Sequence, residues 1–342
     1  MAGNQRVIYS INAIGFAKLG ETTYTPAHGV QSAPISTNFP LEDIFELGQA
    51  SPYQILEELP EVSVTVTKVI DGYPLLTHLA TNGATSASIQ GRGNVRTSMA
   101  LSIFMDTQEN ASGTPITQCE CSGLYWNGTT ITIPVDGNAT EEITLVGNNK
   151  IYKSSGFTFA GSTLNSIFNG SDSPSYGTVL RRQHVDYNNG NTLLPPSLPG
   201  ISSSGTNNAG PDGNYPCSVQ SISVSFDLGR ENIFELGHKG PYFKYPNPQV
   251  DVTTTIDIVN KSGDMVQATE AGILGNGNNL NYETIKIKLL DGTLINCGTR
   301  NKLQGPSVNG GDTSGGIQTL QYTYRNKNVC TITATSDPSA LT

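Results

Sequence analysis

The sequence predicts an all-β protein, mainly antiparallel, built from two tandem copies of one β-sandwich or barrel domain with room for one short helix in each. Three observations support this class. The 342 residues include 37 Gly and 19 Pro, and only 14% are charged, a composition typical of turn-rich β proteins and unlike that of long helices. Turn dipeptides such as Asp71-Gly72 and Asp291-Gly292 separate runs in which apolar and polar residues alternate. A long segment of the chain also occurs twice.

The repeated segment is residues 30–53, which recur as residues 219–242 at an offset of 189 and without a gap. Twelve of the 24 aligned positions are identical, including the motif Ile-Phe-Glu-Leu-Gly at 44–48 and 233–237. A match of this length within one chain indicates an internal duplication.

Weaker matches follow in the same order. Val alternates with short polar residues in 60–67 and again in 248–255, which is the pattern of a half-buried strand. The remaining matches align 97–106 with 282–291, 116–119 with 294–297, and a last strand at 129–134 with 319–324. We therefore predict a first β domain with an N-terminal arm at 1–150, an inserted linker or loop region with a lead-in strand at 151–218, and a second β domain at 219–342.

Local signals predict several smaller elements. Residues 6–11 are expected to form a first strand, and residues 51–58 a short helix with Ser51 as N-cap and Pro52 at the first helical position. The proline-rich residues 193–200 are expected to be extended, and the Ser- and Asn-rich residues 202–214 to form a loop.

The repeated Ile-Phe-Glu-Leu-Gly motif has two interpretations. In the favoured one, its apolar side chains belong to the core of each copy. In the other, its carboxylates lie at contacts between subunits, where each meets a basic group of the neighbour. The second interpretation gives six candidate interface residues: Glu46, Pro52, Tyr53, Glu235, Pro241 and Tyr242.

Charge excludes some functions. The net charge is −9, and residues 30–79 contain seven carboxylates and a single basic residue, Lys68. A protein that grips nucleic acid needs clustered Lys and Arg to contact phosphates, so we expect no specific DNA binding. The start of the chain lacks the regions of a signal peptide, and no apolar run has the length of a membrane span, so we expect neither secretion nor a membrane.

The sequence offers no convincing active site. The four histidines are scattered and the five cysteines form no CxxC pair, so we predict no metal and no cofactor, and buried thiols in a chain made in a reducing compartment. Residues 311–316 are similar to the glycine-rich loop around a serine-protease nucleophile, but Thr313 breaks the spacing and no segment supplies a base. A tight turn is the better interpretation. We expect no catalytic residues and no enzyme.

Several segments resemble a known family. GRENIFELGHKGPY, PQVDVTTTIDIV and INCGTRNKL, with GGDTSGG and LQYTYRN, look like virion structural proteins of large tailed phages, and the pattern is similar to the tail-tube family, including tubes built from a doubled domain. The resemblance implies a β-sandwich or barrel whose sheets join around a lumen that conducts DNA without binding it specifically. Baseplate hub and tail-terminator proteins share this fold.

The resemblance also implies partners and a location. The subunit would form stacked homo-oligomeric rings, as trimers of doubled subunits or as hexamers, and would contact other tail proteins such as sheath, baseplate or terminator. It would lie in the phage tail after assembly in the cytoplasm of the host bacterium. Duplication fits this role, because a doubled subunit fills two positions of a ring.

The alternative function is a β-rich binding module, such as a head-decoration protein or a receptor- or carbohydrate-binding virion protein. Trp126, the single tryptophan, lies beside Tyr125 and just before Asn127-Gly128, so this segment is a candidate sugar-stacking tip. Aromatic residues that pack on their own sheet are the commoner arrangement. A β-fold hydrolase is the third alternative.

Overall fold

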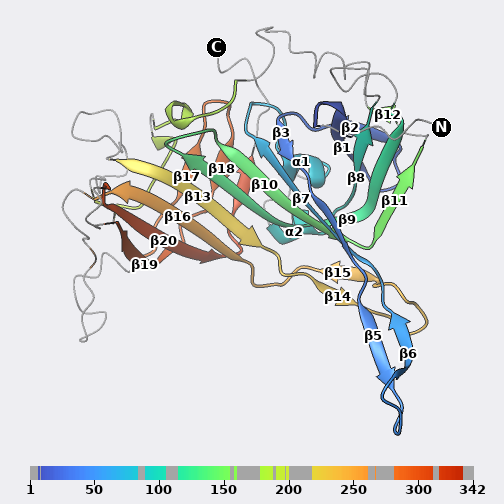
Figure 1. Cartoon of the computed structure of the whole chain (residues 1–342). Coiled ribbons are helices and arrows are strands. Elements are labelled where there is room, and N and C mark those ends of the chain that lie inside the picture. Colours follow the sequence, from blue (N-terminus) through green and yellow to red (C-terminus); the bar gives the residue numbers. More distant parts are fainter. Residues whose placement is uncertain are drawn as a thin grey trace.

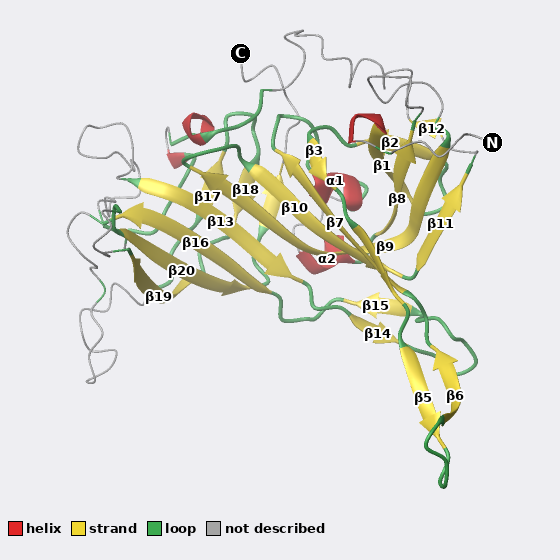
Figure 2. Ribbon diagram, in the orientation of Figure 1, coloured by secondary structure: helices red, strands yellow, loops and turns green. Residues whose placement is uncertain are grey.

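The computed structural model of the chain describes residues 7, 9–83, 89–104, 115–154, 158–159, 178–187, 190–196, 198–199, 218–260, 266, 281–310 and 316–333 (Figure 1). Strands dominate this part of the chain, and nearly all of them pair antiparallel, which confirms the predicted all-β class (Figure 2).

The main sheet is a row of eight adjacent strand positions, the first of which is shared by two short strands, and both halves of the chain contribute to it. Every neighbouring pair in this row is antiparallel. In spatial order the strands are β3 (Val30–Ser32) with β4 (Ile35–Asn38), β7 (Glu61–Val69), β10 (Thr140–Gly147), β9 (Thr117–Pro134), β13 (Val219–Asp227), β16 (Asp251–Val259), β20 (Thr319–Lys327) and β19 (Lys302–Asn309).

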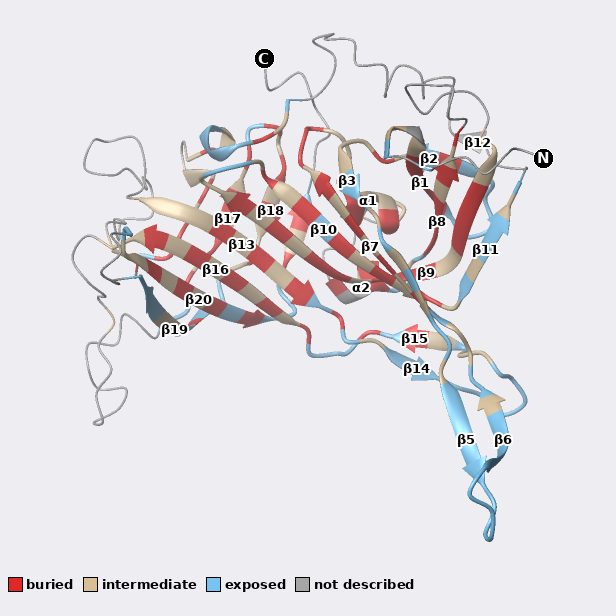
Figure 3. Cartoon of the chain, in the orientation of Figure 1, coloured by how far each residue is buried: buried red, intermediate tan, exposed pale blue. Residues whose placement is uncertain are grey.

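Alternation of residue types determines which face of this sheet is buried. In β7, Val62, Val64 and Val66 are buried, while the serine and threonines between them are half-buried. β16 shows the same pattern, with Val252 and Ile256 inward. Figure 3 shows this alternation of buried and half-buried residues along the strands. Successive side chains of a strand point to opposite faces, so one face of the sheet covers the core and the other carries short polar side chains.

Strand β9 links the main sheet to a second layer. Its first part, up to Tyr125, pairs with β8 (Arg96–Ile103), and residues 118–122 also pair with β11 (Asn149–Lys153), whereas its later part pairs with β10 and β13. Gly123 lies close to this change of partners with φ of +67°, a conformation that glycine adopts without steric cost, and lets the strand change sheets. The second layer continues from β8 through β1 (Asn12–Lys18) and β2 (Thr23–Pro26) to β12 (Thr158–Phe159), which pairs in parallel.

Smaller elements complete the core. A three-stranded sheet of β17 (Lys286–Lys288), β18 (Leu294–Asn296) and β21 (Thr331–Thr333) contributes buried isoleucines to the same core cluster as β16 and β20. The helices are short: α1 (Leu76–Ala80), α2 (Ile89–Gly93) and the 3-10 turns at Tyr9–Ile11 and Arg182–His184. The connecting segment adds Leu180, Leu194 and Leu198 to this core.

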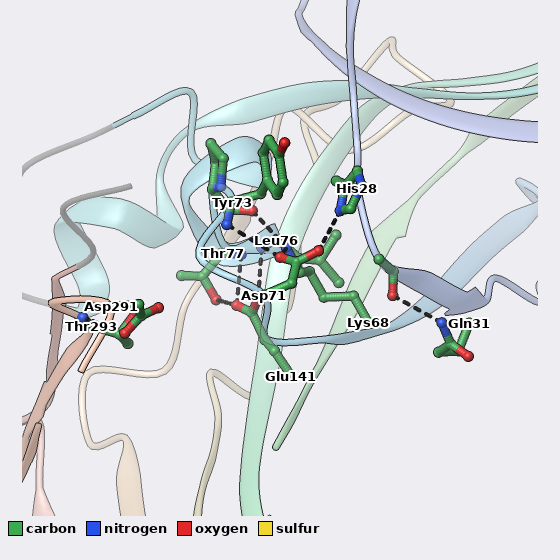
Figure 4. Close-up of polar contacts among 12 residues, drawn as sticks. His28, Gln31, Lys68, Asp71, Tyr73, Leu76, Thr77, Glu141, Asp291 and Thr293 are labelled. Carbon is green, nitrogen blue, oxygen red and sulfur yellow. Dashed lines mark hydrogen bonds and ion pairs between the residues drawn. The ribbon is translucent and has the colours of Figure 1, made fainter. Parts of the chain in front are cut away.

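A buried ion pair lies at the end of β7, where the chain turns towards helix α1 (Figure 4). Lys68 is fully buried, and its Nζ donates to Asp71 Oδ1 at 3.1 Å and to the carbonyl of Pro74 at 3.1 Å. His28 Nδ1 also contacts the Asp71 carboxylate. Burial alone would raise the pKa of Asp71, but the hydrogen bond from His28 and the charge of Lys68 lower it overall.

Glu141 on β10 fixes helix α1 against the sheet. Its carboxylate accepts hydrogen bonds from the backbone N–H groups of Leu76 at 2.6 Å and Thr77 at 2.9 Å, and from the Thr77 hydroxyl at 2.6 Å (Figure 4). The two N–H groups belong to the first turn of the helix, where backbone donors have no partner within the helix itself. Burial raises the pKa of Glu141, although the hydrogen bonds oppose that rise.

Two local predictions are wrong. Residues 51–58 do not form a helix: Pro52–Glu57 is strand β6, which pairs with β5 (Leu41–Phe45) across a tight turn, so the backbone groups find partners on a neighbouring strand. The first strand does not lie at 6–11, because Tyr9–Ile11 is a 3-10 turn and β1 begins at Asn12, where pairing with β8 begins. The loop expected at 202–214 lies outside the described residues.

We expect Asp71→Ala to lower the free energy of unfolding by about 3 to 5 kcal/mol, because it leaves the Lys68 ammonium buried without its counter-ion. The control is Asp136→Ala, which removes an exposed carboxylate 3.6 Å from Arg182 and should change the free energy by less than about 0.5 kcal/mol. Urea unfolding followed by circular dichroism measures both. Equal effects in the two variants would contradict the role given to Asp71.

Candidate assembly site

The two copies of the repeated motif form two hairpins with the same pairing. Hairpin one consists of β5 and β6 (residues 41–57), and hairpin two of β14 (Glu231–Ile233) and β15 (Phe243–Tyr245). Ile44 pairs with Gln54 in hairpin one, and their counterparts in the repeat, Ile233 and Phe243, pair with each other in hairpin two. The turns also correspond, since Gly48 and Gly237 both have positive φ, +99° and +89°.

The apolar side chains of the motif are exposed, so the favoured prediction that they belong to the core is wrong. Leu47 and Leu236 lie at the hairpin tips with relative exposures of 104% and 103%, and Phe45 and Phe234 are exposed as well. Hairpin one extends beyond the sheet and has no second layer to cover it (Figure 3), and the tip of hairpin two is exposed in the same way. Contiguous exposed apolar side chains of this kind typically mark an interaction surface.

The six candidate interface residues all lie on these hairpins. Glu46, Pro52, Tyr53, Glu235 and Tyr242 are exposed, and Pro241 is half-buried. Tyr53 and Tyr242, which correspond in the repeat, have nearly equal exposures of 68% and 67%. Their role in assembly stays a prediction.

Strand pairing in the main sheet also repeats. Ile35 of β4 pairs with Val64 of β7, and the counterpart of Ile35 in the repeat, Val224 of β13, pairs with Thr254 of β16. On the other side of the same strands, Val64 pairs with Leu145 and Thr254 with Tyr324. The order β4–β7–β10–β9, which we call the first unit, therefore matches β13–β16–β20–β19, the second unit.

The outermost strand pair of each unit contains the same irregularity. The pairing of β10 with β9 passes from Thr144–Gly128 to Leu145–Trp126 and skips Asn127. The pairing of β20 with β19 passes from Thr323–Gly305 to Tyr324–Leu303 and skips Gln304. Asn127 and Gln304 thus occupy equivalent positions in the two units.

This register corrects one step of the sequence alignment. Residues 319–324 were expected to match 129–134, but their partners on β16 show that they occupy the position of residues 140–145. The two strands have little sequence in common, and only their pairing identifies them.

The two units are joined edge to edge within the chain. The last strand of the first unit, β9, pairs with the first strand of the second unit, β13, and places Ile131 opposite Val224 and Thr130 opposite Ser225. The strands at the two ends of the row have one free edge each within the described part of the chain. Among the described strands of this sheet, β19 pairs with β20 alone, and β3 and β4 pair with β7 alone. Such edges present unpaired backbone N–H and C=O groups.

The outer face of the joined sheet is polar and carries little positive charge. The strands β7, β10, β9, β13 and β16 contain one basic residue, Lys68, which points to the buried face. Carboxylates such as Glu142 and Asp257 lie among the hydroxyls, and Asp257 accepts from Ser221 Oγ at 2.5 Å. The outward residues are mainly hydroxylic: Ser63, Thr65, Thr67, Thr130, Thr132, Thr144, Ser221, Ser223, Ser225, Thr253 and Thr255.

Positive charge appears on this face only at its far end. Arg325 and Lys327 of β20 both pair with Asp251, with Lys327 Nζ at 2.6 Å and Arg325 Nε at 2.7 Å from its carboxylate. The pKa of Asp251 is lowered to about 2, mainly by the hydrogen bond from Arg325. A groove of about 530 Å³ lies beside Asp251 and includes Glu142 and Ser225 in its lining. The carboxylates of this face repel a phosphate backbone, and its hydroxyls carry no positive charge that would attract one.

Hairpin two is docked against the first unit. Arg230, just before β14, donates from Nε to the carbonyl of Trp126 at 2.8 Å and from Nη1 to the carbonyl of Lys244 at 2.7 Å. Burial lowers the pKa of Arg230 to about 10. The Phe243 ring packs edge-on against Tyr125 at 5.4 Å between centroids, and Arg96 Nη2 donates to the carbonyl of Tyr242 at 3.0 Å.

The same contacts remove the candidate sugar-binding tip. Trp126 and Tyr125 are exposed by only 1% and 4%, and they lie within strand β9 and not at a hairpin tip. Trp126 Nε1 donates to Thr129 Oγ1 at 2.8 Å, and its ring packs edge-on against Phe226. The pair therefore belongs to the junction between the units.

Chemistry-bearing groups are few in the described part of the chain. It contains no cluster of three or more His, Cys, Asp or Glu side chains able to hold a metal ion. Four of the cysteines, Cys119, Cys121, Cys297 and Cys330, are free and buried. Within that same part, no helix has the length and apolar character to cross a membrane. Residues 311–315 of the glycine-rich loop lie outside it.

No protein-family model matches the chain, and no curated protein sequence matches it. Among solved structures, the tube-terminating cap of the anti-feeding prophage aligns with a TM-score of 0.33 and 10% identity over 45% of this chain and 95% of that chain. A chain of the sheath–tube complex of an extracellular contractile injection system, PVC, in the extended state aligns with a TM-score of 0.31 and 12% identity, over 45% of this chain and 95% of that chain.

A chain of the native gene transfer agent virion aligns at a TM-score of 0.30 and 10% identity, over 43% of this chain and 99% of that chain. These neighbours are components of contractile injection systems and phage-like particles. TM-scores this low do not establish a common fold.

We expect Leu228→Ala to lower the free energy of unfolding by about 2 to 5 kcal/mol, because Leu228 is fully buried where hairpin two joins the first unit. The matched control is Phe39→Ala at the corresponding position of the first copy, where the side chain is 65% exposed and the monomer should lose less than about 0.5 kcal/mol. Thermal unfolding at a concentration that keeps the chain monomeric measures both. A loss at Phe39 as large as that at Leu228 would contradict the assigned environments.

Proposed function

We propose that the chain is a structural protein of a tailed phage or phage-like particle, a tail-tube subunit whose copies join edge to edge into stacked rings that conduct DNA. The observation that carries this proposal is the internal junction between β9 and β13. It joins two units of the same strand order and leaves, at the ends of the row, the two edges that would make the same junction again.

The internal junction predicts which residues would pair in the proposed junction between two chains. Replacing each residue of the pair Ile131–Val224 by its counterpart in the other unit places Val308 of one chain opposite Ile35 of the next. The pair Thr130–Ser225 in the same way gives Ser307 opposite Ser36. A contact between two different surfaces of identical chains is head-to-tail, and it closes into a ring when the rotation per subunit divides a full turn. Since each chain supplies two units, three chains would make a ring with approximate six-fold symmetry.

The polar face of the sheet has a composition that suits the lining of a channel for DNA. The opposite face of the sheet covers the core, so in the proposed ring the core lies outside the sheet and the serine- and threonine-rich face lines the lumen. A conduit for DNA must avoid Lys and Arg contacts with phosphate, and five adjacent strands present none on this face. The resemblance of the sequence to tail-tube proteins supports the same arrangement.

Other tail components follow from this role. A tube of stacked rings needs partners at its ends and on its outer wall, so we propose sheath, baseplate or terminator proteins as partners and the virion tail as the location. The exposed apolar hairpins are the described surfaces best suited to contacts of this kind.

A cysteine pair tests the predicted junction. In the double variant Ser36→Cys, Ser307→Cys, the new thiols would lie directly opposite each other across two chains, within the distance that a disulfide spans. We expect oxidation to yield covalent dimers and trimers on a non-reducing gel. The control pair Ser36→Cys, Thr323→Cys places the second thiol one strand farther away, on β20, and should yield none. Monomers only in the first variant, or equal cross-linking in both, would contradict the junction.

A further inference from the structure

Corresponding residues of the two hairpin regions have different environments. Leu228 is fully buried, whereas its counterpart in the first copy, Phe39, is 65% exposed. Lys244 is only 7% exposed, whereas its counterpart Ile55 is 53% exposed. Since the strands pair in the same register, the difference comes from what lies beneath each hairpin. Hairpin two rests on the first unit, whereas hairpin one is held at its base by Lys239, whose Nζ donates to the Glu57 carbonyl at 2.6 Å, and the rest of it extends away from the described strands.

The surface that supports hairpin two has a counterpart on the second unit. Hairpin two contacts β9 at Tyr125 and Trp126. The pairing irregularity that β9 and β19 share makes Lys302 and Leu303 the equivalent positions on β19. A pocket of about 510 Å³ lies there, with Lys302 and Leu303 in its wall. The surrounding lining includes Tyr282, Arg300, Arg325 and Lys327.

The charges of hairpin one and this pocket are complementary. The pocket contains four basic side chains, of which Arg325 and Lys327 are paired with Asp251, while Arg300 and Lys302 are exposed. Lys302 Nζ lies over the Tyr282 ring, 5.4 Å from its centroid. Hairpin one contains no Lys or Arg, and its carboxylates are Glu42, Asp43, Glu46 and Glu57.

We propose that hairpin one of each chain docks in the basic pocket at the β19 edge of a second copy, as hairpin two docks on β9 within the chain. In this arrangement Phe39 becomes buried as Leu228 is, and Gln54 lies against Lys302 as Phe243 lies against Tyr125. Glu42 and Asp43 lie close to Arg300 and Lys302. The inference rests on the proposed head-to-tail joining, because β19 and β4 must meet for the hairpin to reach the pocket.

Charge reversal tests the docking. We expect Arg300→Glu with Lys302→Glu, and separately Glu42→Lys with Asp43→Lys, to weaken assembly at least about tenfold, since like charges then face each other. The chain that carries all four substitutions restores opposite charges at every contact and should assemble within about threefold of the wild type. Sedimentation velocity over a concentration series at low salt measures the assembly constant.

Two controls separate docking from folding and from ring formation. Arg181→Glu with Arg182→Glu makes the same charge change at exposed residues outside the pocket and should leave assembly unchanged. Circular dichroism should show native spectra for all variants, because the substituted side chains are exposed.

The Ser36→Cys, Ser307→Cys pair, placed in each charge variant, reports whether the strand edges still meet. Cross-linking with no effect of charge reversal, or with no rescue by the four substitutions, would overturn the docking and leave the edge junction standing. A wild-type chain without cross-linking and without assembly would overturn both.

Discussion

The structure depends on one constraint: the backbone N–H and C=O groups at the edge of a sheet need partners. In the middle of the row this is met by the pairing of β9 with β13, which turns two four-stranded units into one sheet over a common core. At the ends of the row, β19 and β3 with β4 leave the same groups open among the described strands. We propose that pairing between chains satisfies these groups in the same way that β9 and β13 do within the chain.

The same reasoning explains the hairpins. Two segments with half of their residues identical, with the same register and with glycines of positive φ at the same turn position, would have equal environments if sequence alone decided burial. They differ because hairpin two has β8 and β9 beneath it, where Arg230 and Phe243 find partners, whereas hairpin one extends away from the body of the chain (Figure 1). The apolar residues that the two share are exposed in both hairpins, which is why we propose that they serve contacts outside the fold of the single chain.

Much of the fold could be predicted from the sequence, because strand alternation is a local signal. Residues 61–69 and 251–259 alternate strictly and form strands of the main sheet, and the exact spacing of the repeat indicates that its two copies share one local structure. Burial of Leu47 and Leu236 could not be judged, since an apolar side chain looks the same whether it packs in a core or at an interface. The helix predicted at 51–58 failed because pairing with β5 overrides a weak local preference. The positions of Lys68, Asp71 and Glu141 could not be foreseen, because their partners come from distant segments.

The central claim is that the strand edges close a ring. An electron cryomicroscopy reconstruction of the purified full chain in its assembled form tests it most directly. The account predicts a closed ring with a central hole, in which β19 of one chain pairs antiparallel with β4 of the next and the face bearing Thr65, Ser223 and Thr255 lines the hole. A ring whose contacts leave β19 and β4 unpaired, or a chain that stays monomeric at high concentration, would contradict it.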